Sequence, residues 1–153
     1  MTTSNRGLDL IKQFEGFSSK AYIDLVGLPT IGYGTLIDRQ DEEWLLSATI
    51  TREEATRLLK QDVQPIEQQL NRMIIQTVSQ NQFDALVSFC YNLGTGALRR
   101  STLLKKINCN PNDPMIKREF LRWVYAGGKR VQGLVKRRKA ESDLYFTPII
   151  DMT

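Results

Sequence analysis

The chain has 153 residues, of which 41% are hydrophobic and 25% charged, as in a soluble globular protein with an ordinary core. It contains no histidine and only two cysteines, which excludes a Ser-His-Asp triad, a Cys-His nucleophile, a histidine-ligated zinc site and a thiolate metal cluster. Hydrolytic chemistry would therefore depend on carboxylates and hydroxyls, and we expect no metal and no cofactor.

The net charge of +4 is unevenly distributed along the chain. Residues 1–98 carry a net charge of −4, residues 99–139 carry +11, and the last 14 residues carry −3. A region this basic indicates a polyanionic partner, such as nucleic acid, an anionic membrane face or an acidic cell-wall polymer. The alternative is a solvated basic face without a partner.

Neither a membrane span nor a secretory signal is evident. No apolar run approaches the roughly 20 residues that cross a bilayer, and the N-terminus "MTTSNRGLDL" lacks a basic start and an apolar core. We therefore expect the protein to accumulate in the cytoplasm and not to insert stably into a membrane.

The first predicted helix runs from about Ser4 to Glu15, with apolar residues on one side and Gly16 as a stop. From Lys20 to Ile37 the pattern changes to short extended pieces broken by "VGLP", which predicts a small antiparallel sheet.

Residues 51 to about 75 are predicted to form a long helix. It opens with a capping box, in which Thr51 is followed three residues later by Glu54. Pro65 would kink this helix or break it.

A second capping box, Ser79 with Gln82, opens a helix that ends at Gly94. Three further helices are expected: about Thr102 to Ile107, the segment "MIKREFLRWVYA" after Asp113-Pro114, and about Leu134 to Tyr145 after a break at Gly127-Gly128.

The fold class is therefore α+β. We expect a single domain with a small lobe of about residues 1–50 containing the sheet, a bridging helix of about residues 51–75, and an all-helical lobe of about residues 76–153. Cys90 is expected to be a buried free thiol and Cys109 to lie in a loop, and a cytoplasmic location argues against a disulfide.

The segment "FEGFSSKAYIDLVGLPTIGYG" contains candidate catalytic groups. Glu15 lies at the end of the first helix, where the helix dipole disfavours the anion. A carboxylic acid that stays protonated is what a general acid must be. The alternative is an ordinary solvated glutamate.

A five-residue loop would place Asp24 and Thr30 nearly opposite each other on paired strands, with both side chains on one face. A carboxylate and a hydroxyl can together hold a water molecule. Gly32 and Gly34 follow on that face, where the lack of side chains would let a bulky ligand approach the backbone. The alternative is a turn aspartate and an edge threonine. Two carboxyl groups with a shared water are typical of acid/base glycoside hydrolysis.

At these residues the chain resembles the phage lysozymes, glycoside hydrolase family 24, which include T-even lysozymes and lambdoid endolysins. The family pattern is Glu, eight residues, Asp, five residues, Thr, and Glu15, Asp24 and Thr30 match it, followed by "TIGYG". The resemblance covers about residues 7 to 146 and is closest to lambdoid endolysins. It continues through "LNRMI", "QNQFDALVSFCYNLGTGALRRSTLLKKIN", "EFLRW", "AGG" and "GLVKRRKAESDLY".

The resemblance implies a lysozyme-like fold with an active-site cleft between the two lobes. It implies an endolysin (muramidase) that hydrolyses the β-1,4 bond between N-acetylmuramic acid and N-acetylglucosamine, leading to host lysis. Glu15 would be the general acid, Asp24 would activate or stabilise the attack of water, and Thr30 would position that water.

Further roles follow from the same resemblance. Leu36 and Tyr91 fall where family members contact the glycan. Arg137 or Arg138 would pair with Glu15 across the cleft, unless both belong to the solvated basic face. Many relatives have histidine where this chain has Thr35, so we expect altered surroundings of the site and not lost activity.

The expected partner is the peptidoglycan glycan strand, whose lactyl and peptide carboxylates suit a basic lobe. We expect a monomer that waits in the host cytoplasm and reaches the wall through a holin pore. Retention of Asp24 and Thr30 favours hydrolysis over a lytic transglycosylase route. Two rivals remain, a nucleic-acid-binding module and a catalytically silent wall-binding domain, although no nucleic-acid-binding signature is evident.

Overall fold

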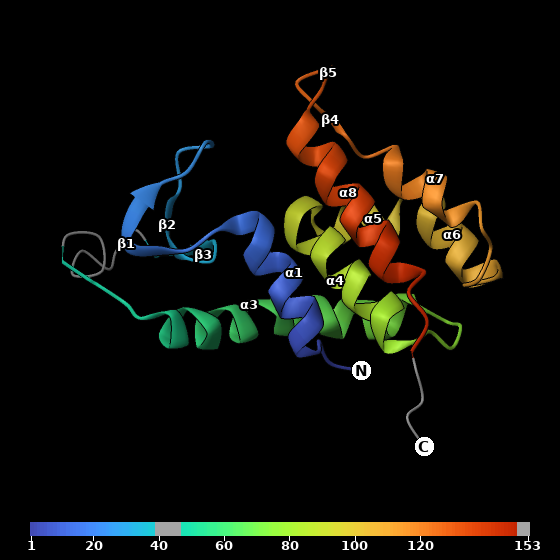
Figure 1. Ribbon diagram of the computed structural model, residues 1–153, viewed down its shortest axis with the longest axis horizontal. Coiled ribbons are helices and arrows are strands. Elements are labelled where there is room, and N and C mark those ends of the chain that lie inside the picture. The colour runs from blue at the N-terminus through green and yellow to red at the C-terminus, as the bar shows by residue number, and fades with distance from the viewer. Residues whose placement is uncertain (39–46, 150–153) are drawn as a thin grey trace. The chain divides into compact units, whose positions relative to one another are not determined.

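The computed structural model describes residues 1–38 and 47–149. The chain divides into two compact units, which we call the helical unit (residues 1–10 and 65–153) and the sheet unit (residues 11–64). Two helices, α1 (Asn5–Glu15) and α3 (Arg52–Met73), contribute residues to both units. Figure 1 shows the elements of each unit.

Helix α1 begins and ends within one residue of the prediction. It ends because Gly16 adopts a φ of +70°, and the Gly16 N–H donates to the Lys12 carbonyl. Leu8 and Ile11 are buried, as the helical spacing predicted. Glu15 is therefore the last residue of the helix.

The first residues belong to the helical unit and not, as predicted, to the lobe that contains the sheet. The N–H and the hydroxyl of Thr3 both donate to Glu67 Oε2 at 2.6 Å. The N–H and hydroxyl of Ser4 donate to the carboxylate of Asp84. A Cβ on Gly7 would lie 2.8 Å from Asp84 Cβ, so this glycine is required by close packing.

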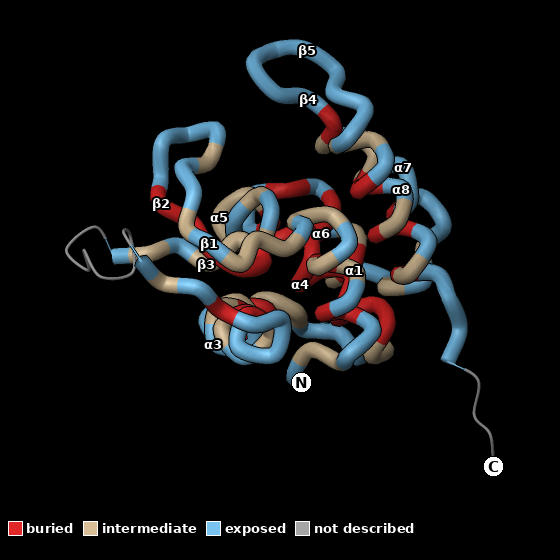
Figure 2. Tube along the Cα trace, turned by 60° about the vertical axis from the view of Figure 1, so that its left-hand side comes forward, coloured by how far each residue is buried: buried red, intermediate tan, exposed pale blue. Residues whose placement is uncertain are grey.

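The predicted small antiparallel sheet is confirmed. It has three strands in the order β1 (Ser18–Ile23), β2 (Pro29–Gly32) and β3 (Thr35–Leu36). All four residues of the central strand β2 are buried, as the tube in Figure 2 shows.

The capping box of α3 is also confirmed: Glu54 N–H donates to Thr51 Oγ1 at 3.1 Å, and Thr51 N–H donates to Glu54 Oε1 at 3.4 Å. The helix continues through Pro65 without a break. Pro65 is exposed, so the carbonyl that loses its helical partner can bond to water. It is also the residue at which the chain passes from the sheet unit to the helical unit.

The helical unit is built around α4 (Gln80–Leu93) and α8 (Gln132–Tyr145), which pack side by side (Figure 1). Both halves of the predicted Ser79–Gln82 capping box are formed. Ten consecutive residues of α4, from Asn81 to Cys90, are buried. The remaining helices are α5 (Thr95–Arg99), α6 (Thr102–Cys109) and α7 (Ile116–Leu121), of which α5 was not predicted.

The prediction that this lobe is all-helical is wrong. A two-stranded antiparallel ribbon, β4 (Tyr125–Ala126) and β5 (Lys129–Arg130), follows α7. Its turn consists of Gly127 and Gly128 with φ values of +58° and +77°, the signs that a tight primed hairpin turn requires. The glycine pair was interpreted only as a break, although such a pair between two short strands is a hairpin signal.

The two cysteines differ in their surroundings. Cys90 is 2% exposed, and burial raises the pKa of its thiol to about 12. Cys109 is exposed and is the last residue of α6, so its predicted place in a loop is off by one residue. None of the described helices has the length and apolar character needed to cross a bilayer.

A buried ionic cluster joins α4 to α8. Glu141 is fully buried, accepts from Ser88 Oγ at 2.6 Å and pairs with Arg138 Nε at 2.7 Å and Arg137 Nε at 3.4 Å. Arg138 also donates to Asn92 Oδ1 at 2.9 Å. Burial raises the pKa of Glu141 and lowers the pKa of Arg138, and the opposite charges of the pair counteract both shifts.

Replacing Glu141 with alanine should destabilise the protein strongly, because the buried guanidinium of Arg138 would lose its counter-charge and Arg137 would lose one ion pair. We expect the free energy of unfolding to fall by about 3–5 kcal/mol. Urea unfolding measures this. Asp143→Ala on the exposed side of the same helix is the control and should change stability by no more than about 0.5 kcal/mol. Equal effects of the two changes would contradict this role of the cluster.

Candidate active site

Asp24 closes the turn between β1 and β2. Its Oδ1 accepts the N–H of Val26 at 3.0 Å and the N–H of Leu28 at 2.8 Å, while its own N–H donates to the Leu28 carbonyl at 2.9 Å. Gly27, with a φ of +83°, lets the chain reverse within residues 25–27. Asp24 is therefore a turn aspartate, and Oδ2 is the carboxylate oxygen that makes no hydrogen bond to the described residues.

The predicted register of the two strands is wrong by two residues. Thr30 pairs with Tyr22, and Pro29 pairs with Ile23, because the loop is shorter than the five residues assumed. Side chains alternate between faces with a period of two, so a shift of two residues leaves each on its face. Asp24 and Thr30 consequently still share a face, although they are not opposite each other.

A row of three side chains crosses the sheet at Thr30. Thr30 pairs with Tyr22 on β1 and with Leu36 on β3. Thr30 is 3% exposed, whereas Tyr22 is 40% and Leu36 60% exposed. A short buried hydroxyl therefore lies between two large exposed side chains. The Thr30 hydroxyl donates to the Leu28 carbonyl at 3.0 Å, which leaves its oxygen free to accept a hydrogen bond.

The pKa of Tyr22 shows that Glu15 lies near this row of side chains. The pKa of the Tyr22 phenol is raised, first by burial and then by the negative charges of Glu15 and Asp24. Both carboxylates therefore lie within electrostatic reach of one phenol. Sequence reasoning missed Tyr22, although its position two residues before Asp24 places it on the same strand face.

Glu15, Asp24, Thr30 and Tyr22 all belong to the sheet unit. This unit supplies a carboxyl group at the end of a helix (Glu15), a carboxylate held through one oxygen (Asp24), and a hydroxyl that can accept a hydrogen bond (Thr30). Such a set can donate a proton on one side and orient a water on another. Within residues 1–38 and 47–149, no three acidic or cysteine side chains gather in a way that could hold a metal ion.

The glycines of this face have a structural explanation. Gly32 and Gly34 adopt φ values of +68° and +94°, which L side chains rarely adopt. A Cβ on Gly32 would lie 3.1 Å from Ala55 Cβ and 3.3 Å from Ile50 Cδ1. Packing of β2 against α3 therefore accounts for Gly32, and its role in substrate binding stays a prediction.

Thr35 links β3 to α3. Its hydroxyl donates to Asp62 Oδ2 at 2.6 Å. Burial raises the pKa of Asp62, and the hydrogen bond from Thr35 counteracts part of this shift. The contact places an uncharged hydroxyl against a half-buried carboxylate, and the effect of Thr35 on activity stays a prediction.

The other predicted site residues lie in the helical unit. Tyr91 is half-buried on α4. Arg137 is 5% and Arg138 0% exposed, in the cluster with Glu141, so the alternative that they belong to a solvated face is wrong. Their pairing with Glu15 and the glycan contacts of Tyr91 and Leu36 stay predictions, as does a cleft between lobes.

Comparison with known proteins gives consistent results. A sequence profile of the phage lysozyme family matches residues 12–141. The endolysin of Bacillus phage B103 is 42% identical over 149 residues, which are 96% of this chain and 55% of that protein. The endolysin of Salmonella phage P22 is 35% identical over 147 residues, which are 96% of this chain and 99% of that protein.

Among solved structures, a mutant of P22 lysozyme superposes with a TM-score of 0.86 at 34% identity, covering 96% of this chain and 99% of that one. The muramidase domain of SpmX from Asticaccaulis excentricus gives a TM-score of 0.83 at 33% identity with the same coverage. The chain belongs to the phage lysozyme family, and its lysozyme-like α+β fold is confirmed. It spans about half the length of the Bacillus phage endolysins that it matches.

Replacing Asp62 with asparagine tests the Thr35 contact through pH. Because the pKa of Asp62 is raised on folding, the wild-type protein loses stability as pH rises from the ordinary value of 3.8 through the folded pKa. The asparagine side chain does not titrate and keeps an oxygen for Thr35. The variant should therefore gain stability relative to wild type across this range and keep that gain at pH 7, as measured by urea unfolding between pH 4 and 8. Asp9→Asn, an exposed change on α1, serves as control, and a pH-independent difference for Asp62→Asn would refute the explanation.

Proposed function

We propose that the protein is an endolysin-type muramidase that hydrolyses the β-1,4 bond between N-acetylmuramic acid and N-acetylglucosamine in peptidoglycan. The observation that carries the proposal is the shared face of Asp24 and Thr30, with the charges of Asp24 and Glu15 both acting on Tyr22. Membership of the phage lysozyme family supports the same conclusion.

In the proposed reaction, Glu15 gives its proton to the glycosidic oxygen as the bond to the anomeric carbon breaks. The Thr30 hydroxyl has donated its own hydrogen to Leu28, so its oxygen accepts one hydrogen of the attacking water. Asp24 Oδ2 accepts the other hydrogen and takes that proton as the water oxygen bonds to the anomeric carbon. Asp24 Oδ1, held by two backbone N–H groups, fixes the direction of Oδ2.

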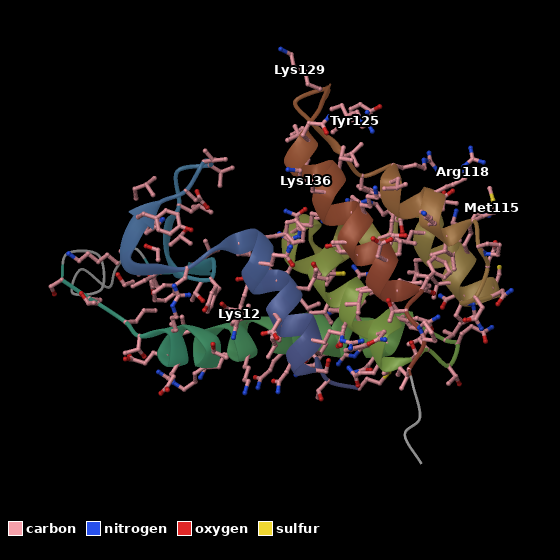
Figure 3. All side chains as sticks on the ribbon, viewed as in Figure 1. Lys12, Met115, Arg118, Tyr125, Lys129 and Lys136 are labelled. Carbon is pink, nitrogen blue, oxygen red and sulfur yellow. The ribbon has the colours of Figure 1, made fainter. Side chains whose placement is uncertain are left out.

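In this proposal the basic region 99–139 attracts the enzyme to the anionic cell wall. Its exposed cations include Lys129 and Arg130 on the β4–β5 ribbon and Lys136 on α8, and Figure 3 labels both lysines. Among the described residues, no acidic side chain forms an ion pair with these three. We further propose that the enzyme acts on the wall after the membrane is permeabilised, with a holin as its route.

Substitution of the three catalytic residues tests the reaction through reducing ends released from purified murein. Glu15→Gln removes the transferable proton and should lower the rate at least about 10²- to 10⁴-fold while the protein stays folded. Asp24→Asn keeps an oxygen for the loop N–H groups but is a poor base, so it should lose activity without losing stability. Thr30→Ser should retain much of the activity, and Thr30→Val should not.

Release of reducing ends by Glu15→Gln at near the wild-type rate would contradict the proposal. Murein binding by the wild-type protein without any release of reducing ends would identify a silent wall-binding domain. A shift of nucleic acid at moderate salt without hydrolysis would identify the nucleic-acid-binding alternative.

Electrostatic capture predicts that activity on murein falls as ionic strength rises, because exposed charges are screened within about 8 Å at 0.15 M salt. Replacing Lys129 and Arg130 with glutamine should lower activity at low salt and flatten this salt dependence. The matched control removes the same charge from exposed positions of α3, as Arg57→Gln with Lys60→Gln. A flat wild-type profile, or equal flattening by both double variants, would count against capture by the 99–139 region.

A further inference from the structure

We propose that Tyr22 is a substrate-contact residue: its ring and Leu36 form two walls of a sugar subsite over Thr30, and its hydroxyl donates a hydrogen bond to a saccharide oxygen. This inference rests on the proposed function. It adds to the acid, the base and the water-holding hydroxyl a fourth group that touches the glycan.

The width of the row suits a sugar ring. Tyr22, Thr30 and Leu36 occupy paired positions on three neighbouring strands. Adjacent strands lie about 4.8 Å apart, so the two outer positions are separated by about 10 Å, with the short threonine between them. A pyranose ring placed over Thr30 would therefore have an aromatic side chain on one side and an aliphatic side chain on the other.

Exposure of the side chains agrees with this arrangement. The floor residue Thr30 is almost completely buried, whereas both wall residues are substantially exposed. Tyrosine combines an apolar ring, which can pack on the face of a sugar, with a polar tip. An exposed tyrosine in a sheet needs no special explanation by itself, but this one lies in the same row as the proposed water-holding residue.

The hydroxyl of Tyr22 is available as a donor. Within residues 1–38 and 47–149 it makes no hydrogen bond. Partial burial, and then the neighbouring charges of Glu15 and Asp24, raise the pKa of the phenol, so the proton stays on the oxygen at neutral pH. Saccharide hydroxyl and acetamido oxygens are suitable acceptors.

Steady-state kinetics on soluble, uncross-linked glycan strands test the contact. Tyr22→Phe removes only the hydroxyl, and the loss of one hydrogen bond should lower kcat/KM about 3- to 10-fold. The loss should appear mainly as a higher KM, since a contact made equally in ground and transition states contributes to binding. Tyr22→Ala also removes the wall and should lower kcat/KM further. Tyr125→Phe, an exposed tyrosine on β4, is the control and should match wild type.

A binding measurement separates contact from chemistry. In a Glu15→Gln background, which cannot turn over the ligand, Tyr22→Phe should weaken binding of the same glycan strands by a similar factor. Kinetics and affinity within twofold of the parent proteins would overturn the inference. So would a drop in folding stability with unchanged KM, which would indicate a purely structural role. Reducing-end release by wild type tests hydrolysis itself, so failure of the proposed function is distinguishable from failure of this contact.

Discussion

The pairing of β1 with β2 is the constraint on which the candidate site depends. The two strands are joined by a turn that Asp24 closes with one carboxylate oxygen, and this closure sets which residues are opposite each other. Thr30 meets Tyr22 only because the chain reverses within residues 25–27. A longer loop would bring a different residue to Thr30, and an odd change in length would turn Asp24 to the other face. The relative placement of Asp24, Thr30 and Tyr22 is therefore set by a local turn and not by a distant support.

Asp24 is a turn aspartate, and its proposed role as a base depends on the oxygen that the turn does not use. One oxygen accepts two backbone N–H groups and the other makes no hydrogen bond to the described residues. A carboxylate held in this way is fixed in orientation without a second acidic or basic side chain. Thr30 is held in a similar way: its hydroxyl donates a hydrogen bond to the Leu28 carbonyl, and its oxygen can still accept one. Both groups are preorganised by backbone atoms of the five residues between them.

The sequence predicted those features that depend on local signals. Both capping boxes, the stop at Gly16 and the presence of a small sheet follow from patterns within a few residues of each other. Strand side chains alternate between faces every second residue, and the predicted register was wrong by an even number of residues. Asp24 and Thr30 were therefore placed on the same face correctly. Tyr22 was missed because nothing in its neighbourhood distinguishes it from any strand tyrosine; its significance comes from the pairing partner and from two charges that act on it.

Contacts between segments that are distant in the sequence could not be predicted from local sequence patterns. The contacts of Thr3 with Glu67 and of Ser4 with Asp84 assign the first residues to the helical unit, and they link positions 64 and 80 residues apart. The arginines of "VKRRK" belong to a buried cluster because Glu141 and Ser88 surround them, which the charge count could not reveal. The basic surface is correspondingly smaller than the net charge of +11 over residues 99–139 suggests.

The two thiols give the protein a practical property. Cys90 on α4 is buried, and burial raises the pKa of its thiol to about 12. It should therefore not react with alkylating reagents while the protein is folded. Cys109 is exposed at the end of α6. A maleimide dye or spin label added to the native protein would therefore attach at one position without any engineered cysteine. Reaction at a second thiol would then report unfolding of α4, which makes the unmodified chain its own probe of core opening.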